Sequence, residues 1–357
     1  MHKIEIRAFF ELLKSGLWEK RVEDVSAFPL SQDVWEKVMD IAKEQTVLGL
    51  IYRGIQNLPK EFHPQKAVLM DLVVEMDRLE RLNVKVNGFI GELIGGYKKI
   101  GVSPVLQKGQ GVAMFYNYPL LRSCGDIDFF IKGGEEFYKT KEFLKSKIQV
   151  YSLPDNSFMY NYKGIEVENH SELIDISNPF KKKYIKRLIE KYGFEEVNLN
   201  GVLVCAPSPV LNLVMLNTHI MKHAFGWGIG LRQVCDIARA YYKLSGDYNS
   251  EELERIYKEL GIKKWSGLLH SFLVKYVGLD RDFLPYKERF VDCDKLLEIV
   301  LSGGNFGFNL RGVAENKKAV VRKANTFSSF FKRSLFSLKY APKECFWLVI
   351  GLLKGQL

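Results

Sequence analysis

The order of hydrophobic periodicities along the chain limits its possible folds more than any other feature. Residues 66–98 carry apolar side chains at spacings of three, four and seven, which predicts one long amphipathic helix. Between residues 101 and 206 short apolar runs replace this period and predict strands. Helical periods return after Ser208-Pro209. This order predicts the α/β (α+β) class, with a mixed-sheet core between N- and C-terminal helical regions.

We divide the chain into an N-terminal helical region (1–100), an α/β core (101–206), a C-terminal helical region (207–316) and a basic tail (317–357). In the core, the patterns predict strands at 104–106, 127–131, 148–153, 158–163 and 165–170, and helices at 110–117 and 135–147. In the C-terminal region they predict helices at 211–224, 231–244, 251–260 and 264–277, and a glycine-rich loop at 301–312.

Composition indicates a globular protein. The 357 residues are 47% hydrophobic and 26% charged, which is ordinary for such a chain. The five cysteines are scattered without CxxC spacing, so we expect neither a disulfide framework nor a structural zinc site, and a cytoplasmic location. The longest apolar run, 346–353, is far shorter than the roughly 20 residues that span a bilayer. We therefore do not expect an integral membrane protein.

Positive charge is concentrated at the C-terminus. The net charge is +10, and residues 317–357 contain nine lysines and arginines and one glutamate. Because the rest of the chain is nearly balanced, nucleic acid is not an expected partner. The tail mixes its cations with apolar side chains: Phe327, Phe330, Phe331, Leu335, Phe336 and Trp347. Such a segment either contacts an anionic membrane peripherally or forms a helix pair that closes the helical region, and both alternatives stay open.

Two aspartates begin the predicted strand of RSCGDIDFFI, residues 122–131. On a strand, Asp126 and Asp128 point to the same face about 7 Å apart. A buried strand should be almost continuously apolar, so these carboxylates are costly unless a cation lies between them. Two Mg²⁺ ions that clamp a phosphoryl group are the usual occupants of such a pair. The pair alone is weak evidence, because it also occurs in turns, caps and exposed strand edges.

The surrounding residues are types that handle phosphate. Gly125 directly precedes the pair, Arg122 and Ser123 precede Gly125, and Lys108-Gly109 lies upstream at the end of a predicted strand. A third carboxylate is expected on a neighbouring strand. Alternation in residues 165–170 places Glu166, Glu168 and His170 on one face.

These residues resemble a known family. LQKGQGVAMFYNYPLLRSCGDIDFFI and IEVENH are similar to the "KG … R-x-S-G-D-x-D" and "E-x-H" pattern of the uncharacterised bacterial nucleotidyltransferase family, within the DNA polymerase beta-type superfamily. The resemblance implies a nucleotidyltransferase-type core in which Asp126 and Asp128 bind divalent metals. Glu168 would complete this metal site and help to deprotonate an attacking hydroxyl. Lys108-Gly109 would form a glycine turn, and Arg122 and Ser123 would lie near the triphosphate.

The implied activity is transfer of a nucleoside monophosphate from a nucleoside triphosphate to a hydroxyl, with release of pyrophosphate. Two Mg²⁺ ions are the expected cofactors and ATP the expected nucleotide, while the acceptor could be a protein, a sugar or another small molecule. One alternative is an inactive binding module that docks through its basic tail. A second, narrower alternative is a nucleotidyltransferase that acts on RNA. Cys124 and Asn169 depart from the family pattern, and neither departure removes a carboxylate.

Two histidines outside this pattern have several interpretations. His219 and His223 are four residues apart on a predicted helix, and Asp236 follows on the next helix, so a metal site is conceivable. Contact with a nucleotide or acceptor through Asn217, His219 and Lys222, or plain packing, are the alternatives. Arg232 and Asp236 are predicted to pair on a helix surface.

Overall fold

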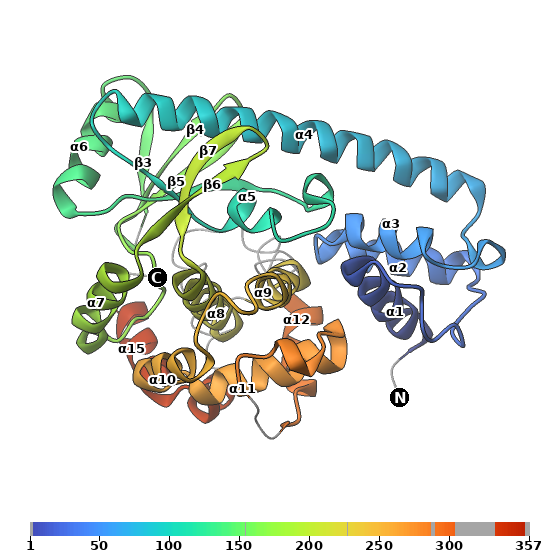
Figure 1. The fold of residues 1–357 in the computed structure, drawn as a ribbon. Coiled ribbons are helices and arrows are strands. Elements are labelled where there is room, and N and C mark those ends of the chain that lie inside the picture. The colour runs from blue at the N-terminus through green and yellow to red at the C-terminus, as the bar shows by residue number, and fades with distance from the viewer. Residues whose placement is uncertain (1–2, 154, 227, 287–289, 304–332, 354–357) are drawn as a thin grey trace.

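The computed structural model describes residues 3–153, 155–226, 228–286, 290–303 and 333–353, as helices around one sheet (Figure 1). The N-terminal helices are α1 (Ile4–Trp18), α2 (Gln32–Glu44), α3 (Leu48–Gln56) and α4 (Lys66–Lys98). The sheet is accompanied by α5 (Lys108–Ala113) and α6 (Gly134–Lys145). Further helices are α7 (Lys182–Tyr192), α8 (Pro209–Phe225), α9 (Leu231–Lys243), α10 (Ser250–Leu260), α11 (Lys263–Phe272), α12 (Asp294–Gly303) and α15 (Pro342–Leu353), and residues 333–340 are helical as well.

Seven strands form one mixed sheet in the order β3-β4-β5-β2-β1-β7-β6. They are β1 (Val105–Leu106), β2 (Asp126–Phe130), β3 (Val150–Ser152), β4 (Phe158–Tyr162), β5 (Ile165–His170), β6 (Phe194–Leu199) and β7 (Val202–Pro207). The pairs β2–β5 and β1–β7 are parallel, and the other pairs are antiparallel. The predicted fold class, a mixed sheet flanked by helices, is confirmed.

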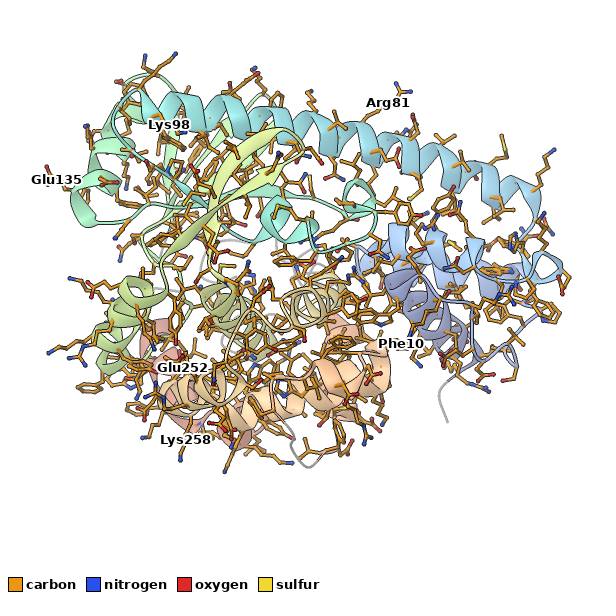
Figure 2. All side chains as sticks on the ribbon, in the orientation of Figure 1. Phe10, Arg81, Lys98, Glu135, Glu252 and Lys258 are labelled. Carbon is orange, nitrogen blue, oxygen red and sulfur yellow. The ribbon has the colours of Figure 1, made fainter. Side chains whose placement is uncertain are left out.

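The two faces of the sheet belong to different cores. Ile127, Phe129 and Val167 pack with the buried side of α4, which lies across one face together with α6 (Figure 1). The opposite side of α4 faces solvent, where the exposed Arg81 projects outward (Figure 2). Helices α8 and α9 cover the other face of the sheet, where Phe130 joins the larger core. Alternation along β2 therefore sends its odd-numbered residues 127 and 129 toward α4 and its aspartates toward α8 and α9.

The described part of the tail packs against the C-terminal helices. Cys345 and Leu348 of α15 are buried, and the Phe336 ring lies 6.0 Å from the Phe225 ring. The described residues of this segment are thus packed against the helical region, and membrane contact stays a prediction. Phe327, Phe330 and Phe331 lie outside the described residues. Among the described helices, none is long and apolar enough to cross a membrane.

Several local predictions need correction. The helix predicted at 110–117 is α5, which begins at Lys108 and ends at Ala113. The loop predicted at 301–312 overlaps the end of α12 at Gly303, and the rest of it lies outside the described residues. Strands β6 and β7 were not predicted at all. The long helix predicted at 66–98 is confirmed and ends at Lys98, slightly beyond the predicted end near Gly95 and Gly96; the strand at 165–170 is confirmed with the predicted bounds.

Candidate functional site

The carboxylates of the site come from two parallel strands in register. Asp126 of β2 lies opposite Glu166 of β5, and Asp128 lies opposite Glu168. Because side chains alternate along each strand, all four carboxylates point to the face that α8 and α9 cover. This arrangement places four negative charges on one small area of the sheet, which is costly without a cation nearby.

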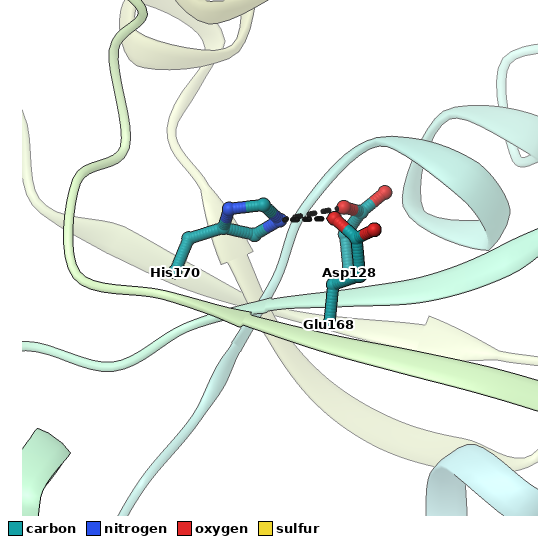
Figure 3. Close-up of side chains that lie close together, drawn as sticks. All are labelled: Asp128, Glu168 and His170. Carbon is teal, nitrogen blue, oxygen red and sulfur yellow. Dashed lines mark hydrogen bonds and ion pairs between the residues drawn. The ribbon is translucent and has the colours of Figure 1, made fainter. Parts of the chain in front are cut away.

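Two basic side chains meet Asp128. Its Oδ1 lies 2.8 Å from Nε2 of His170 and 3.2 Å from Nζ of Lys108. The same His170 nitrogen is 3.3 Å from Oε2 of Glu168, so the ring bridges both carboxylates (Figure 3). Burial and the charge of Lys108 lower the pKa of His170, but its contacts with Asp128 and Glu168 outweigh them and raise it to about 9.

The two aspartates differ in charge environment. Burial alone would raise the pKa of Asp128, but Lys108 and His170 beside it hold this pKa well below its usual range. Burial, together with the charge of Asp128, raises the pKa of Asp126 to about 6. A divalent cation beside Asp126 would favour its charged form.

The Lys108-Gly109 turn lies directly over β2. Gly109 has φ 39° and ψ −119°, a conformation that favours glycine, and a Cβ at this position would lie 3.4 Å from the carbonyl oxygen of Asp126. Lys108 also has a positive φ, 32°. The turn therefore brings backbone and the Lys108 ammonium close to the aspartates.

A cavity of about 280 Å³ lies between this face of the sheet and helices α8 and α9. We call it the first cavity. It is lined by Lys108, Gly109, Arg122, Gly125, Asp126, Asp128, Glu166, Glu168, Leu216, His219, Ile220, His223, Arg232, Gln233 and Asp236. Seven of the eight predicted site residues line the first cavity. The eighth, Ser123, is not among the described residues of its lining.

Arg122 is held in a buried ion pair with α9. Its Nε and Nη2 each donate to a carboxylate oxygen of Asp236 at 2.7 Å, and the hydroxyl of Tyr116 donates to Oδ1 at 2.7 Å. The predicted surface pair of Arg232 and Asp236 is therefore wrong, because both side chains are buried and Asp236 is the partner of Arg122. Arg122 borders the first cavity, but its guanidinium is already hydrogen-bonded to Asp236.

The segment before Asp126 is fixed through a backbone carbonyl. Nη1 of Arg232 donates to the carbonyl oxygen of Ser123 at 2.9 Å, and Nη1 of Arg122 donates to the same oxygen at 3.3 Å. We expected the Ser123 hydroxyl near the triphosphate, whereas the described contacts of Ser123 are through its carbonyl. Gly125, which follows, lines the first cavity.

His219 and His223 are not a metal pair with Asp236. Nδ1 of His219 lies 3.0 Å from Oδ2 of Asp175, and Nζ of Lys222 lies 2.8 Å from Oδ1 of the same carboxylate. The rings of His219 and His223 lie 4.5 Å apart and border the first cavity. Sequence reasoning missed Asp175, although it follows the E-x-H segment by only five residues. Asn217 is buried beside Tyr241 and Ser266 and does not join the described lining.

The donor set fits Mg²⁺. This ion prefers oxygen ligands, and Asp126, Asp128 and Glu168 offer carboxylate oxygens on one face. One ligand atom from each of Asp128, Glu168 and His170 lies within 4.8 Å of the others, a spacing at which a single ion could contact them (Figure 3). The residues that would hold the metal are therefore the three carboxylates, with His170 beside them.

Comparison with known proteins assigns a family. The family model described as uncharacterised nucleotidyltransferase matches residues 31–277, which is more than half of the chain. No curated protein matches. Among solved structures, an antigenic nucleotidyltransferase-like protein from Paracoccidioides brasiliensis is 16% identical, with a TM-score of 0.31. That alignment covers 43% of this chain and 74% of the other.

Proposed function

Because the chain belongs to the uncharacterised nucleotidyltransferase family, we propose that it transfers a nucleoside monophosphate from a nucleoside triphosphate to a hydroxyl acceptor. The observation that carries this proposal is the convergence of Asp126, Asp128 and Glu168 on one sheet face beside Lys108. Such a constellation suits phosphoryl chemistry, which depends on positioning and on charge stabilisation more than on covalent catalysis.

The reaction exchanges one bond to phosphorus for another. The acceptor oxygen forms a bond to the α-phosphorus, the bond from this phosphorus to the α–β bridging oxygen breaks, and pyrophosphate leaves with that oxygen. The acceptor proton passes to the carboxylate of Glu168. Two Mg²⁺ ions held by Asp126, Asp128 and Glu168 would supply the positive charge that phosphate transfer requires.

The other residues of the first cavity would bind and orient the nucleotide. Lys108 would bind a phosphate oxygen, since its ammonium already lies 3.2 Å from Asp128 at the same face. The backbone of Gly109 and Gly125 would allow the phosphates to approach closely. Arg122 would keep the segment before Asp126 in place through Asp236 and Ser123, which makes it a positioning residue. ATP is the nucleotide that we would test first.

Calorimetric titration of ATP, GTP, CTP and UTP, with and without Mg²⁺, tests this proposal. In the Asp126→Asn/Asp128→Asn variant we expect Mg²⁺-dependent binding to weaken at least 100-fold and pyrophosphate release to disappear, because the isosteric amides cannot hold the metal. The matched control is Glu195→Gln/Glu196→Gln, which removes two exposed carboxylates from β6 of the same sheet. This control should bind nucleotide as the wild type does.

Two outcomes would contradict the proposal. Unchanged binding or turnover in the aspartate variant would show that the carboxylates do not hold the metal. Absence of binding for all four nucleotides would favour the alternative, an inactive module of the same fold that docks through its basic tail.

A further inference from the structure

A second cavity lies on the other side of His170 from the first cavity. It has a volume of about 300 Å³ and is lined by Asp155, Asn156, Ser157, His170, Ser171, Glu172, Asp175, Ile176, Ser177, Pro179, Lys182, Lys222, Trp347, Ile350 and Gly351. We propose that this second cavity binds the hydroxyl acceptor, and that the acceptor is a neutral, polyhydroxylated small molecule of the size of a sugar. This proposal rests on the proposed function of the first cavity.

The position of the second cavity suits an acceptor. His170 lines it, while Nε2 of the same ring contacts Asp128 and Glu168 of the first cavity. Asp175 lines it as well and contacts His219 of the first cavity. In-line displacement needs the attacking hydroxyl on the side of the α-phosphorus opposite the leaving pyrophosphate. Two cavities on either side of His170, whose ring contacts Asp128 and Glu168, provide separate places for the two substrates.

The charges of the second cavity argue against an anionic acceptor. Nζ of Lys182 lies 2.8 Å from Glu172, and Nζ of Lys222 lies 2.8 Å from Asp175, so both lysines are already paired with carboxylates. Asp155 adds a third carboxylate to the lining, and the basic ring of His170 is already paired with Asp128 and Glu168. A nucleic-acid end or a phosphorylated molecule would bring further negative charge to this site, which is unfavourable without uncommitted cations.

The remaining lining has the character of a sugar site. Trp347 of α15 is half-buried, and its ring lies 5.7 Å from that of Phe180. An aromatic ring covers the apolar face of a sugar, while the carboxylates and the polar side chains of Asn156 and Ser171 accept and donate hydrogen bonds around its edge. The volume lies at the low end of the roughly 300–1,000 Å³ typical of ligand pockets, which fits one small ring.

The tail builds one wall of this cavity. Glu344 of α15 accepts hydrogen bonds from the backbone N–H groups of Ser177 and Asn178, the second at 3.3 Å. This contact holds α15 against the segment that follows β5. The C-terminal segment would therefore take part in acceptor binding through Trp347 and Ile350.

Saturation-transfer NMR with small probes tests the assignment. The probes are glucose, N-acetylglucosamine and myo-inositol, with glucose 6-phosphate as an anionic molecule of similar size. Trp347→Ala removes the aromatic wall, and Ile350→Trp fills the cavity without removing a contact from its rim. The control is Leu353→Ala, because Leu353 is exposed on the same helix and is not in the described lining.

We expect at least one neutral probe to bind, with affinity at least tenfold lower in both cavity variants and within twofold of wild type in the control. Saturating MgATP should not displace it. The assignment is overturned if no neutral probe binds, if glucose 6-phosphate binds more tightly than glucose, if both cavity variants bind as wild type, or if MgATP competes. Loss of nucleotide binding alone would overturn the proposed function and leave the second cavity as a binding site; absence of sugar binding alone would do the reverse.

Discussion

Asn169 is a buried amide on a strand that otherwise separates polar from apolar residues cleanly. It is fully buried on the α4 side of β5, while its neighbours lie on the opposite face, where Glu168 lines the first cavity and His170 lines the second. The hydroxyl of Tyr97 on α4 donates to Oδ1 of Asn169 at 2.9 Å and lies 2.7 Å from the hydroxyl of Tyr160. Asn169, which departs from the family pattern, thus has a polar partner in Tyr97 on α4. Strands β2 and β5 remain in register at this position.

Tyr97→Phe tests the importance of this buried network. The change leaves the Asn169 carbonyl and the Tyr160 hydroxyl without their shared partner, so we expect the free energy of unfolding to fall by about 1–3 kcal/mol. Tyr162→Phe is the matched control, because its hydroxyl donates to Glu92 at an exposed site, where water replaces the contact. Urea unfolding of both variants measures the difference. Equal losses would contradict a special role for the buried network.

His270 makes stability depend on pH. Burial lowers its pKa to about 3, whereas an unfolded histidine has a pKa of about 6.5. Below about pH 6.5 the unfolded state binds a proton that the native state does not bind, so the free energy of unfolding falls as the pH falls toward 3. Between pH 7.5 and 5.5 this residue should account for a loss of about 1.4 kcal/mol.

His270→Gln isolates this contribution, because glutamine can keep a hydrogen bond to the hydroxyl of Tyr241, which lies 3.1 Å from Nε2 of His270. Urea unfolding at the two pH values should show a smaller pH effect in the variant, by about 1.4 kcal/mol. The same pH effect in wild type and variant would show that His270 is not responsible.

Among the elements, β6 and β7 were predictable from the turn that joins them but not from the hydrophobic pattern of β6. Asn200 and Gly201 join them with φ values of 48° and 91°, as expected for a two-residue hairpin turn. An Asn-Gly pair between alternating residues was therefore a usable signal. It was overlooked because β6 is an edge strand with polar residues, including Glu195 and Glu196, and has little apolar character.

Local sequence patterns predict the central residues of the candidate site but not the residues that surround them. The spacing of Asp126 and Asp128, and the alternation of Glu168 and His170, follow from strand geometry alone. The pairing of Arg122 with Asp236 joins residues 114 positions apart and leaves no local trace in the sequence. The same holds for Trp347, which reaches the second cavity from the far end of the chain.

Helices α1 and α3 approach each other through glycines. A Cβ at Gly54 of α3 would lie 2.1 Å from the carbonyl oxygen of Leu12, and a Cβ at Gly16 of α1 would lie 1.9 Å from that of Leu50. Both distances are impossible for a real side chain, so any larger residue forces the helices apart.

Gly54→Ala should therefore lower the free energy of unfolding by about 1–3 kcal/mol, because the backbones must separate and lose packing. Gly88→Ala is the control, since a Cβ at Gly88 in α4 would meet nothing within 4 Å. This control should raise the free energy of unfolding by about 0.5–1 kcal/mol through helix propensity. Thermal and urea unfolding measure both changes, and a neutral Gly54→Ala would mean that α1 and α3 are not closely packed in solution.

At the scale of the whole molecule, one apolar cluster connects parts that are remote in sequence. It contains Phe9 of α1, Phe225 of α8 and Leu348 of α15, together with Phe130 of the sheet. The N-terminal helices and the described part of the tail thus share a core with the helices that cover the first cavity. Among the described residues of the tail, the exposed large apolar side chains are Leu335, Leu338, Phe346 and Leu353, and these would make the peripheral membrane contact that the sequence leaves open.

Substitutions at two leucines of α15 distinguish a structural role of the tail from a surface role. Leu348 is 5% exposed and Leu353 is 69% exposed. Leu348→Ala should lower the free energy of unfolding by about 2–5 kcal/mol, because it leaves a cavity in the shared core. Leu353→Ala should change it by no more than about 0.5 kcal/mol. If urea unfolding of the two variants gave the same value as wild type, α15 would not be part of the folded core, and the wall that it gives to the second cavity would be lost with it.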